Sequence, residues 1–64
     1  MVKVLLLGRE TPLEFPEAVT FSYPKNQVVL YSYDGLPVAV FDTKRVKYVC
    51  KRISNNETEY RYII

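Results

Sequence analysis

From Glu17 to Ile64 the chain is a succession of short apolar runs, each ended by residues that favour turns. The runs are rich in β-branched and aromatic residues, and they recur at the spacing of about 8–12 residues that is typical of small all-β domains. We therefore expect a single all-β domain over residues 1–64. Its architecture is expected to be an antiparallel barrel of about five or six strands, of SH3-like or Sm-like type, or a strongly bent meander.

The expected strands follow from composition and from the turns between them. The sequence predicts strands at residues 2–7, 18–23, 27–33, 36–41, 46–53 and 57–64. Asp34 and Gly35 separate two of these runs, and an Asp-Gly pair in that position is a strong signal for a β-hairpin. The strands on either side of it are therefore the pair that the sequence predicts most strongly. Pro37 lacks an N–H and so indicates an edge position.

Two single helical turns are also expected. Thr11, Pro12 and Glu14 match the cap, the first residue and the third residue of a helix start,. Because Pro16 follows, this turn is confined to residues 12–15. Asp42 precedes a polar stretch and can cap a second turn, at residues 42–45.

The residue inventory excludes most enzyme chemistries. The chain has no His, no Trp and a single Cys, which excludes an intramolecular disulfide framework, a Cys/His zinc site and His-based catalysis. Glu10, Glu14 and Glu17 lie in a loop broken by proline, where we interpret them as solvated residues and not as paired catalytic carboxylates. We expect no catalytic residue, no cofactor, no metal site and no small-molecule substrate, so the chain is not expected to be an enzyme.

Two further features that can carry chemistry are interpreted as structural. Residues 2–8 have the apolar character of the first strand of a nucleotide-binding unit, but no second glycine follows Gly8, so we expect a core strand,. Cys50 shares strand parity with Val46 and Tyr48, so all three are expected to face the core. A buried cysteine in such a position acts as a small hydrophobic residue.

Positive charge is concentrated between Thr43 and Ile53, although the net charge of the chain is only +2. A basic stripe beside aromatic side chains can hold single-stranded nucleic acid on a small β-barrel. The candidate nucleic-acid-binding residues are Lys44, Arg45, Lys47, Lys51 and Arg52 for phosphates, with Tyr31 and Tyr33 for base stacking. The alternative interpretation of the basic run is a solvated edge strand that resists edge-to-edge pairing.

The tyrosines indicate a second function, which we favour. With six Tyr, three Phe, one Met and no Trp, we expect aromatic rings to supply most of the bulky core and exposed tyrosines to mark a protein interface. A domain of this size buries only about 60% of the surface of its unfolded chain, so a second copy would stabilise it. We therefore expect a non-enzymatic protein-binding module that forms a homodimer. The candidate interface residues are Tyr23, Tyr60, Tyr62, Ile63 and Ile64.

The expected cellular setting rests on weaker signals. No segment has the roughly 20 apolar residues of a membrane span, and residues 2–8 lack the length and cleavage site of a signal peptide,. We expect a cytoplasmic protein with no membrane partner and a reduced Cys50 thiol. An accessory role, as in small proteins of mobile genetic elements, is expected by association alone.

Overall fold

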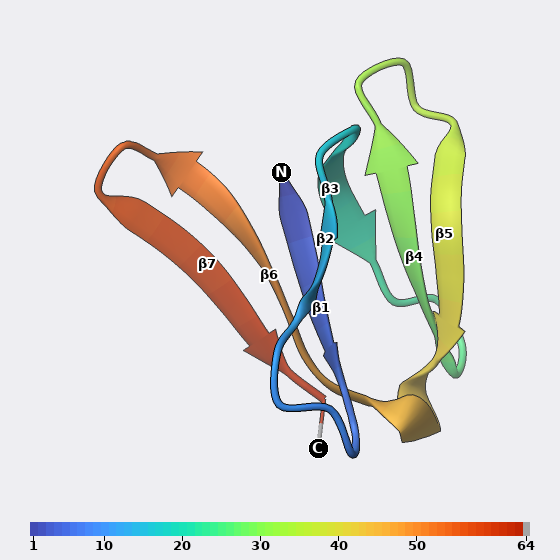
Figure 1. The fold of residues 1–64 in the computed structure, drawn as a ribbon. Helices are drawn as coiled ribbons and strands as arrows, with labels where there is room; N and C mark the ends of the chain where they lie inside the picture. The colour runs from blue at the N-terminus through green and yellow to red at the C-terminus, as the bar shows by residue number, and fades with distance from the viewer. Residues whose placement is uncertain (64) are drawn as a thin grey trace.

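The structure, a computed structural model, describes residues 1–63 and is all-β apart from one 3₁₀ turn. The predicted fold class is confirmed, with antiparallel pairing throughout. The closed barrel is wrong, because the strands form two separate sheets that pack face to face and keep open edges (Figure 1). The expected number of strands is also too low, since the described residues form seven.

The two sheets divide the chain unevenly. Sheet A has the order β2 (Leu13–Phe15), β1 (Val2–Leu6), β6 (Val46–Ser54) and β7 (Glu57–Tyr62). Sheet B is a meander of β3 (Ala18–Ser22), β4 (Gln27–Ser32) and β5 (Pro37–Asp42). The 3₁₀ turn η1 (Thr43–Arg45) carries the chain from β5 back to sheet A. In Figure 1 the β6–β7 hairpin curves away from sheet B as an arm.

The hairpin predicted at Asp34 and Gly35 is present between β4 and β5. The Gly35 N–H donates to the Ser32 carbonyl at 3.0 Å, and Gly35 has a φ of +83°. This left-handed conformation is one that glycine adopts without steric cost. Pro37 opens β5, which is an edge strand as predicted.

The two predicted helical turns have different outcomes. The turn at residues 42–45 is confirmed as η1, where an Asp42 carboxylate oxygen accepts the Lys44 N–H at 2.9 Å. The turn at residues 12–15 is wrong, because Leu13 and Phe15 belong to β2 and pair with Val4 and Val2 of β1. Pairing with β1 satisfies the backbone and places both apolar side chains on the core face, which outweighs the local capping signal.

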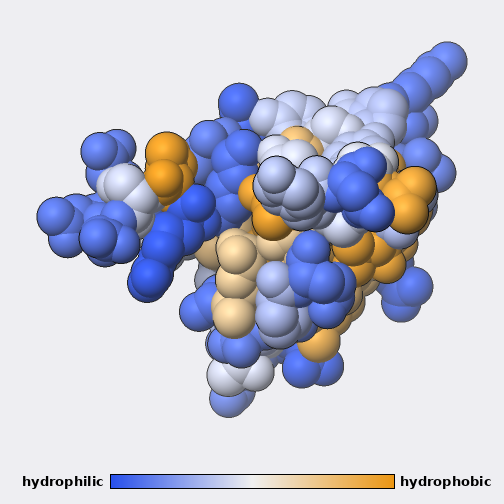
Figure 2. Space-filling model, turned by 90° about the horizontal axis from the view of Figure 1, so that it is seen from above, coloured by the Kyte–Doolittle hydropathy of each residue, from blue (hydrophilic) through white to orange (hydrophobic). Residues whose placement is uncertain are grey.

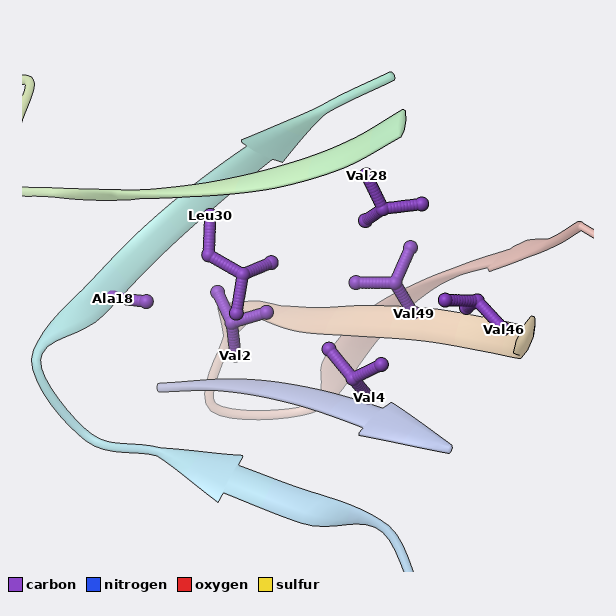
Figure 3. Packing of buried hydrophobic residues seen from close by; sticks show 7 residues of the cluster. All are labelled: Val2, Val4, Ala18, Val28, Leu30, Val46 and Val49. Carbon is purple, nitrogen blue, oxygen red and sulfur yellow. The ribbon is translucent and has the colours of Figure 1, made fainter. Parts of the chain in front are cut away.

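The core between the sheets is made of small aliphatic side chains (Figure 3). Its fully buried members are Val2, Val4, Ala18, Val28, Leu30, Val46 and Val49. Phe15, Phe21 and Phe41 flank this cluster and are only partly buried. The expectation that aromatic rings dominate the core is therefore wrong. Aliphatic side chains fill the space between the sheets, and no tyrosine belongs to the buried cluster,.

Four β-bulges interrupt the sheets and decide which side chains face inward. The extra residues are Val19 in β3, Val38 in β5, and Lys47 and Ile53 in β6. At the bulge in the first part of β6, Leu6 pairs with Val46 while Leu5 pairs with Tyr48. Since one extra residue reverses the alternation of faces, Val46 and Val49 both point into the core. Tyr48 and Cys50 lie on the opposite, outer face of sheet A, so their predicted positions on the core face are wrong, although Cys50 is buried there.

Candidate protein-interaction surface

Three tyrosines gather on the outer face of sheet A, on the strands β6 and β7. Tyr48 pairs with Tyr62 across these strands, and Tyr60 lies opposite Cys50. The ring centroid of Tyr48 lies 5.6 Å from that of Tyr60 and 5.5 Å from that of Tyr62. The Tyr60 and Tyr62 rings are stacked, with their centroids 6.2 Å apart. These separations are those of attractive aromatic pairs. We call the three residues the tyrosine face.

The tyrosine face is open to solvent over most of its area. Tyr60 and Tyr62 are 53% and 63% exposed, whereas Tyr48 is half-buried beneath them. Burial raises the pKa of the Tyr48 hydroxyl, with a smaller contribution from Cys50 and the two neighbouring phenols. Rigid rings with a polar tip are the side chains that protein interfaces favour, because they offer contact area at low entropic cost.

A pocket of about 380 Å³ adjoins the tyrosine face where β1 and β6 run side by side. Its lining residues are Met1, Lys3, Glu14, Cys50, Lys51, Arg52, Thr58 and Tyr60. Lys3 and Glu14 form an ion pair at 3.7 Å across β1 and β2. Burial raises the pKa of the Cys50 thiol, which keeps it protonated at neutral pH. A protonated, buried thiol is a poor nucleophile, so Cys50 serves as an apolar wall of this pocket.

The strand β7 presents one edge that no other strand of the described chain covers. The Ile63 N–H donates to the Lys47 carbonyl at 2.9 Å, next to the Tyr48–Tyr62 pair. Because main-chain groups in an antiparallel strand alternate in direction, the odd-numbered residues of β7 point toward β6. The N–H and C=O groups of Thr58, Tyr60 and Tyr62 are therefore directed to the open edge.

The inner face of β7 carries charge and looks across a groove toward β3. The Arg61 guanidinium carbon lies 5.2 Å from the centroid of the Tyr23 ring, within the range of a cation–π contact,. Glu59 lines the groove, of about 500 Å³, together with Phe21, Ser22, Tyr23 and Pro24. Tyr23, a predicted interface residue, thus lies on the far wall of this groove and not on the tyrosine face.

Of the other predicted interface residues, the structure brings Tyr60 and Tyr62 together on one face. Ile63 is partly buried against the core, where it seals the end of sheet A. Ile64 lies outside the described residues. Tyr48 was missed by sequence reasoning, since strict alternation from Val46 places it inside. The signal that can find it is the spacing of Val46 and Val49, two core residues three apart, which only a bulge allows in a strand.

The residues predicted to bind nucleic acid do not form one surface. Lys44 and Arg45 lie in η1, at one end of β6, while Arg52 lies near the other end (Figure 1). The Lys51 ammonium is engaged with β3, since it donates to Thr20 Oγ1 at 2.9 Å. The edge position of the alternative interpretation is wrong, because β6 is paired on both sides.

The two stacking candidates lie on the other sheet. Tyr31 is half-buried on β4, where its hydroxyl accepts a hydrogen bond from Ser22 at 3.3 Å. Tyr33 follows β4 in the hairpin loop and is 92% exposed. Lys47, at its bulge in β6, is exposed to solvent without an ion pair among residues 1–63.

The face seen from above mixes hydrophilic and hydrophobic areas (Figure 2). The projecting arm on the left of that view is largely hydrophilic, and most of the hydrophobic area lies in the centre and on the right. Within residues 1–63 no group of three or more His, Cys, Asp or Glu is placed to hold a metal ion. The described chain contains no helix of the length and hydropathy needed to cross a bilayer. Comparisons with protein-family models, curated proteins and solved structures found no match.

Proposed function

We propose that this chain is a non-enzymatic interaction module that self-associates through the open edge of β7 and the tyrosine face beside it. The observation that carries the proposal is the contrast between β7 and the other edge strands. An uncovered edge is a template for strand addition, and proteins that do not use an edge protect it.

Each of the other edges has such protection. β2 is only three residues long, lies between Pro12 and Pro16, and presents Glu14. β3 is interrupted by the bulge at Val19, and β5 begins with Pro37 and contains a second bulge. Short length, proline, inward or edge charges and bulges all discourage pairing with another chain.

The edge of β7 lacks the proline, the bulge and the short length, and its charged residues are of both signs, so they can pair with those of a second copy. Its six residues contain no proline, no lysine and no extra residue, and two of its outward-directed positions are the exposed tyrosines. Pairing of this edge with a second copy would cover part of both tyrosine faces. It would also enlarge the apolar area that a small domain of this size buries.

The test is a substitution that blocks the edge and spares the monomer. Thr58→Pro removes an N–H that faces away from β6, so the folded monomer should keep its circular dichroism spectrum. Sedimentation velocity over a concentration series should show a reversible dimer for the wild type and for the matched Thr58→Val control, and a monomer for Thr58→Pro. A wild type that stays monomeric at every concentration refutes the proposal, and so does a dimer that Thr58→Pro leaves unchanged.

A second candidate function is the binding of single-stranded nucleic acid at the same face. It is favoured by the pocket beside Tyr60, where Arg52 lines the wall next to an exposed ring. Cations for phosphates and rings for base stacking are the two parts of such a site.

Fluorescence anisotropy with a labelled mixed-sequence oligonucleotide, titrated with salt, tests this candidate. Affinity should fall log-linearly with salt concentration, and Arg52→Glu should weaken binding while Lys25→Glu, in the turn before β4, should not. Absence of binding at low salt, or equal loss in both variants, removes the candidate.

A further inference from the structure

Resting on the self-association proposed above, we infer that two copies pair their β7 strands antiparallel in one specific register, with Tyr60 of each copy opposite Tyr60 of the other. A two-fold axis then passes between these residues, and the two copies of sheet A become one continuous sheet. The contact is isologous, so it closes at two copies and does not propagate into a fibre.

The direction of the main-chain groups admits this register. Thr58, Tyr60 and Tyr62 point their N–H and C=O groups toward the open edge, as the Ile63–Lys47 hydrogen bond requires. With Tyr60 on the axis, Thr58 lies opposite Tyr62 of the second copy. All three outward-directed positions therefore face outward-directed positions, which is the condition for hydrogen-bonded pairs in an antiparallel ladder.

The charges of β7 select this register over its neighbours. Centred on Tyr60, the pairing places Glu59 of each copy opposite Arg61 of the other, which makes two opposite-charge pairs. Centred on Glu59 it would oppose the two Glu59 carboxylates, which offsets part of the attraction between Arg61 and Glu57 of the other copy. Centred on Arg61 it would oppose two guanidinium groups and form no opposite-charge pair. Glu59 and Arg61 fall at the non-hydrogen-bonded positions, where facing side chains approach most closely. The interaction energy between facing charges therefore differs most between registers at these positions.

Both charged residues are available for these pairs. The single ion pair among residues 1–63 joins Lys3 and Glu14, so neither Glu59 nor Arg61 has an ionic partner among these described residues. Glu59 borders the groove toward Phe21 and Tyr23, which leaves about 500 Å³ beside it. A guanidinium from the second copy can enter that space and still keep an aromatic ring within reach.

Cysteine cross-linking tests the register directly. In a Cys50→Ala background, Tyr60→Cys brings two thiols to a hydrogen-bonded pair with Cα atoms about 5.5 Å apart, inside the range that a disulfide spans. Glu59→Cys and Arg61→Cys are the matched controls, because in this register each lies more than about 7 Å from its own copy. Mild oxidation of the full chain should therefore give disulfide-linked dimer chiefly from Tyr60→Cys.

A charge exchange supplies an independent readout that adds no thiol. Glu59→Arg alone and Arg61→Glu alone each replace two attractive pairs by two repulsive ones, and each should weaken its homodimer roughly tenfold. An equimolar mixture of the two variants should restore the wild-type affinity as a heterodimer, since every facing pair is then of opposite charge.

The outcomes separate this inference from the proposed function. Cross-linking that is strongest at position 59 or 61, or a mixture that stays as weak as the single variants, overturns the Tyr60 register while leaving self-association through β7 in place. A dimer that cross-links at none of the three positions and ignores both charge changes overturns the β7 interface itself.

Discussion

The Lys51 ammonium of β6 lies 2.9 Å from the Thr20 hydroxyl oxygen of β3 and 5.4 Å from the centroid of the Phe21 ring. Residues 31 positions apart in sequence are thereby joined across the open side of the two-sheet structure. This contact joins the curved β6–β7 arm to sheet B, as does the cation–π contact between Arg61 and the Tyr23 ring.

Loss of the Lys51 charge should loosen this arm. Lys51→Met keeps the apolar stem and removes both the hydrogen bond and the cation–π contact, so we expect the free energy of unfolding to fall by about 1–2 kcal/mol in urea denaturation. Lys47→Met is the matched control, because Lys47 is exposed, and it should change stability by less than about 0.5 kcal/mol. Equal effects in the two variants would contradict a bridging role for Lys51.

Truncation of Leu30 should be the most damaging single change in the core. Leu30 is fully buried at the centre of β4, so Leu30→Ala loses transfer free energy and leaves a cavity, at a cost of about 2–5 kcal/mol,. A domain of this length is stable by roughly 3–10 kcal/mol in total, so the variant should unfold at markedly lower denaturant concentration. Leu36→Ala, at an exposed loop position, serves as the control and should have little effect. A small loss at Leu30 would show that the sheets do not pack as described.

The Asp34 carboxylate should carry a small acid-dependent part of the stability. The Ser32 hydroxyl donates to it and holds its pKa below the usual value of 3.8. A group whose folded pKa is depressed stabilises the fold above its unfolded pKa, and the contribution is lost as the pH falls through the folded value. Ser32→Ala should raise the Asp34 pKa toward 3.8, which a carboxyl NMR titration can follow. Ser22→Ala should leave this titration unchanged, and a titration that is identical in both variants contradicts the assignment.

The contribution of the Asp42 cap of η1 to the stability of the fold should be measurable by itself. Asp42→Ala leaves the Lys44 N–H without its side-chain acceptor, and we expect thermal and urea unfolding to report a loss of about 1 kcal/mol. Asp42→Asn retains an acceptor oxygen and should preserve most of the stability. If asparagine is as harmful as alanine, the negative charge and not the cap is what matters at this position.

Much of the strand pattern could be predicted because its signals are local. The runs that became β1 and β3 to β7 are rich in β-branched and aromatic residues, and turn residues such as Gly35 separate them. β2 could not be predicted in this way, since the decision between a helical turn and a strand at Leu13 depends on the presence of β1 beside it. The barrel failed for a similar reason: closure depends on contacts between distant strands, which composition does not specify.

The candidate site was only half accessible to sequence reasoning. Tyr60 and Tyr62 could be proposed from the apolar, alternating end of the chain, but Tyr48 could not, because the bulge at Lys47 reverses the face on which it lies. The spatial arrangement of the basic run could not be predicted for a related reason. Neighbouring charges in sequence were treated as neighbours in space, whereas Lys51 turns toward Thr20 and Lys44 lies in the η1 turn.

The division of the strands between the sheets has a kinetic consequence. Sheet B is a meander of consecutive strands, so its hairpins can form by closing short loops. Sheet A forms only when Val4 of β1 pairs with Val49 of β6. The chain between these two residues contains all three strands of sheet B. The entropy of that closure is lost before any of its contacts are gained. Formation of the β1–β6 pair is therefore the step that should limit the folding rate, with the meander as the surface on which the two ends of the chain meet.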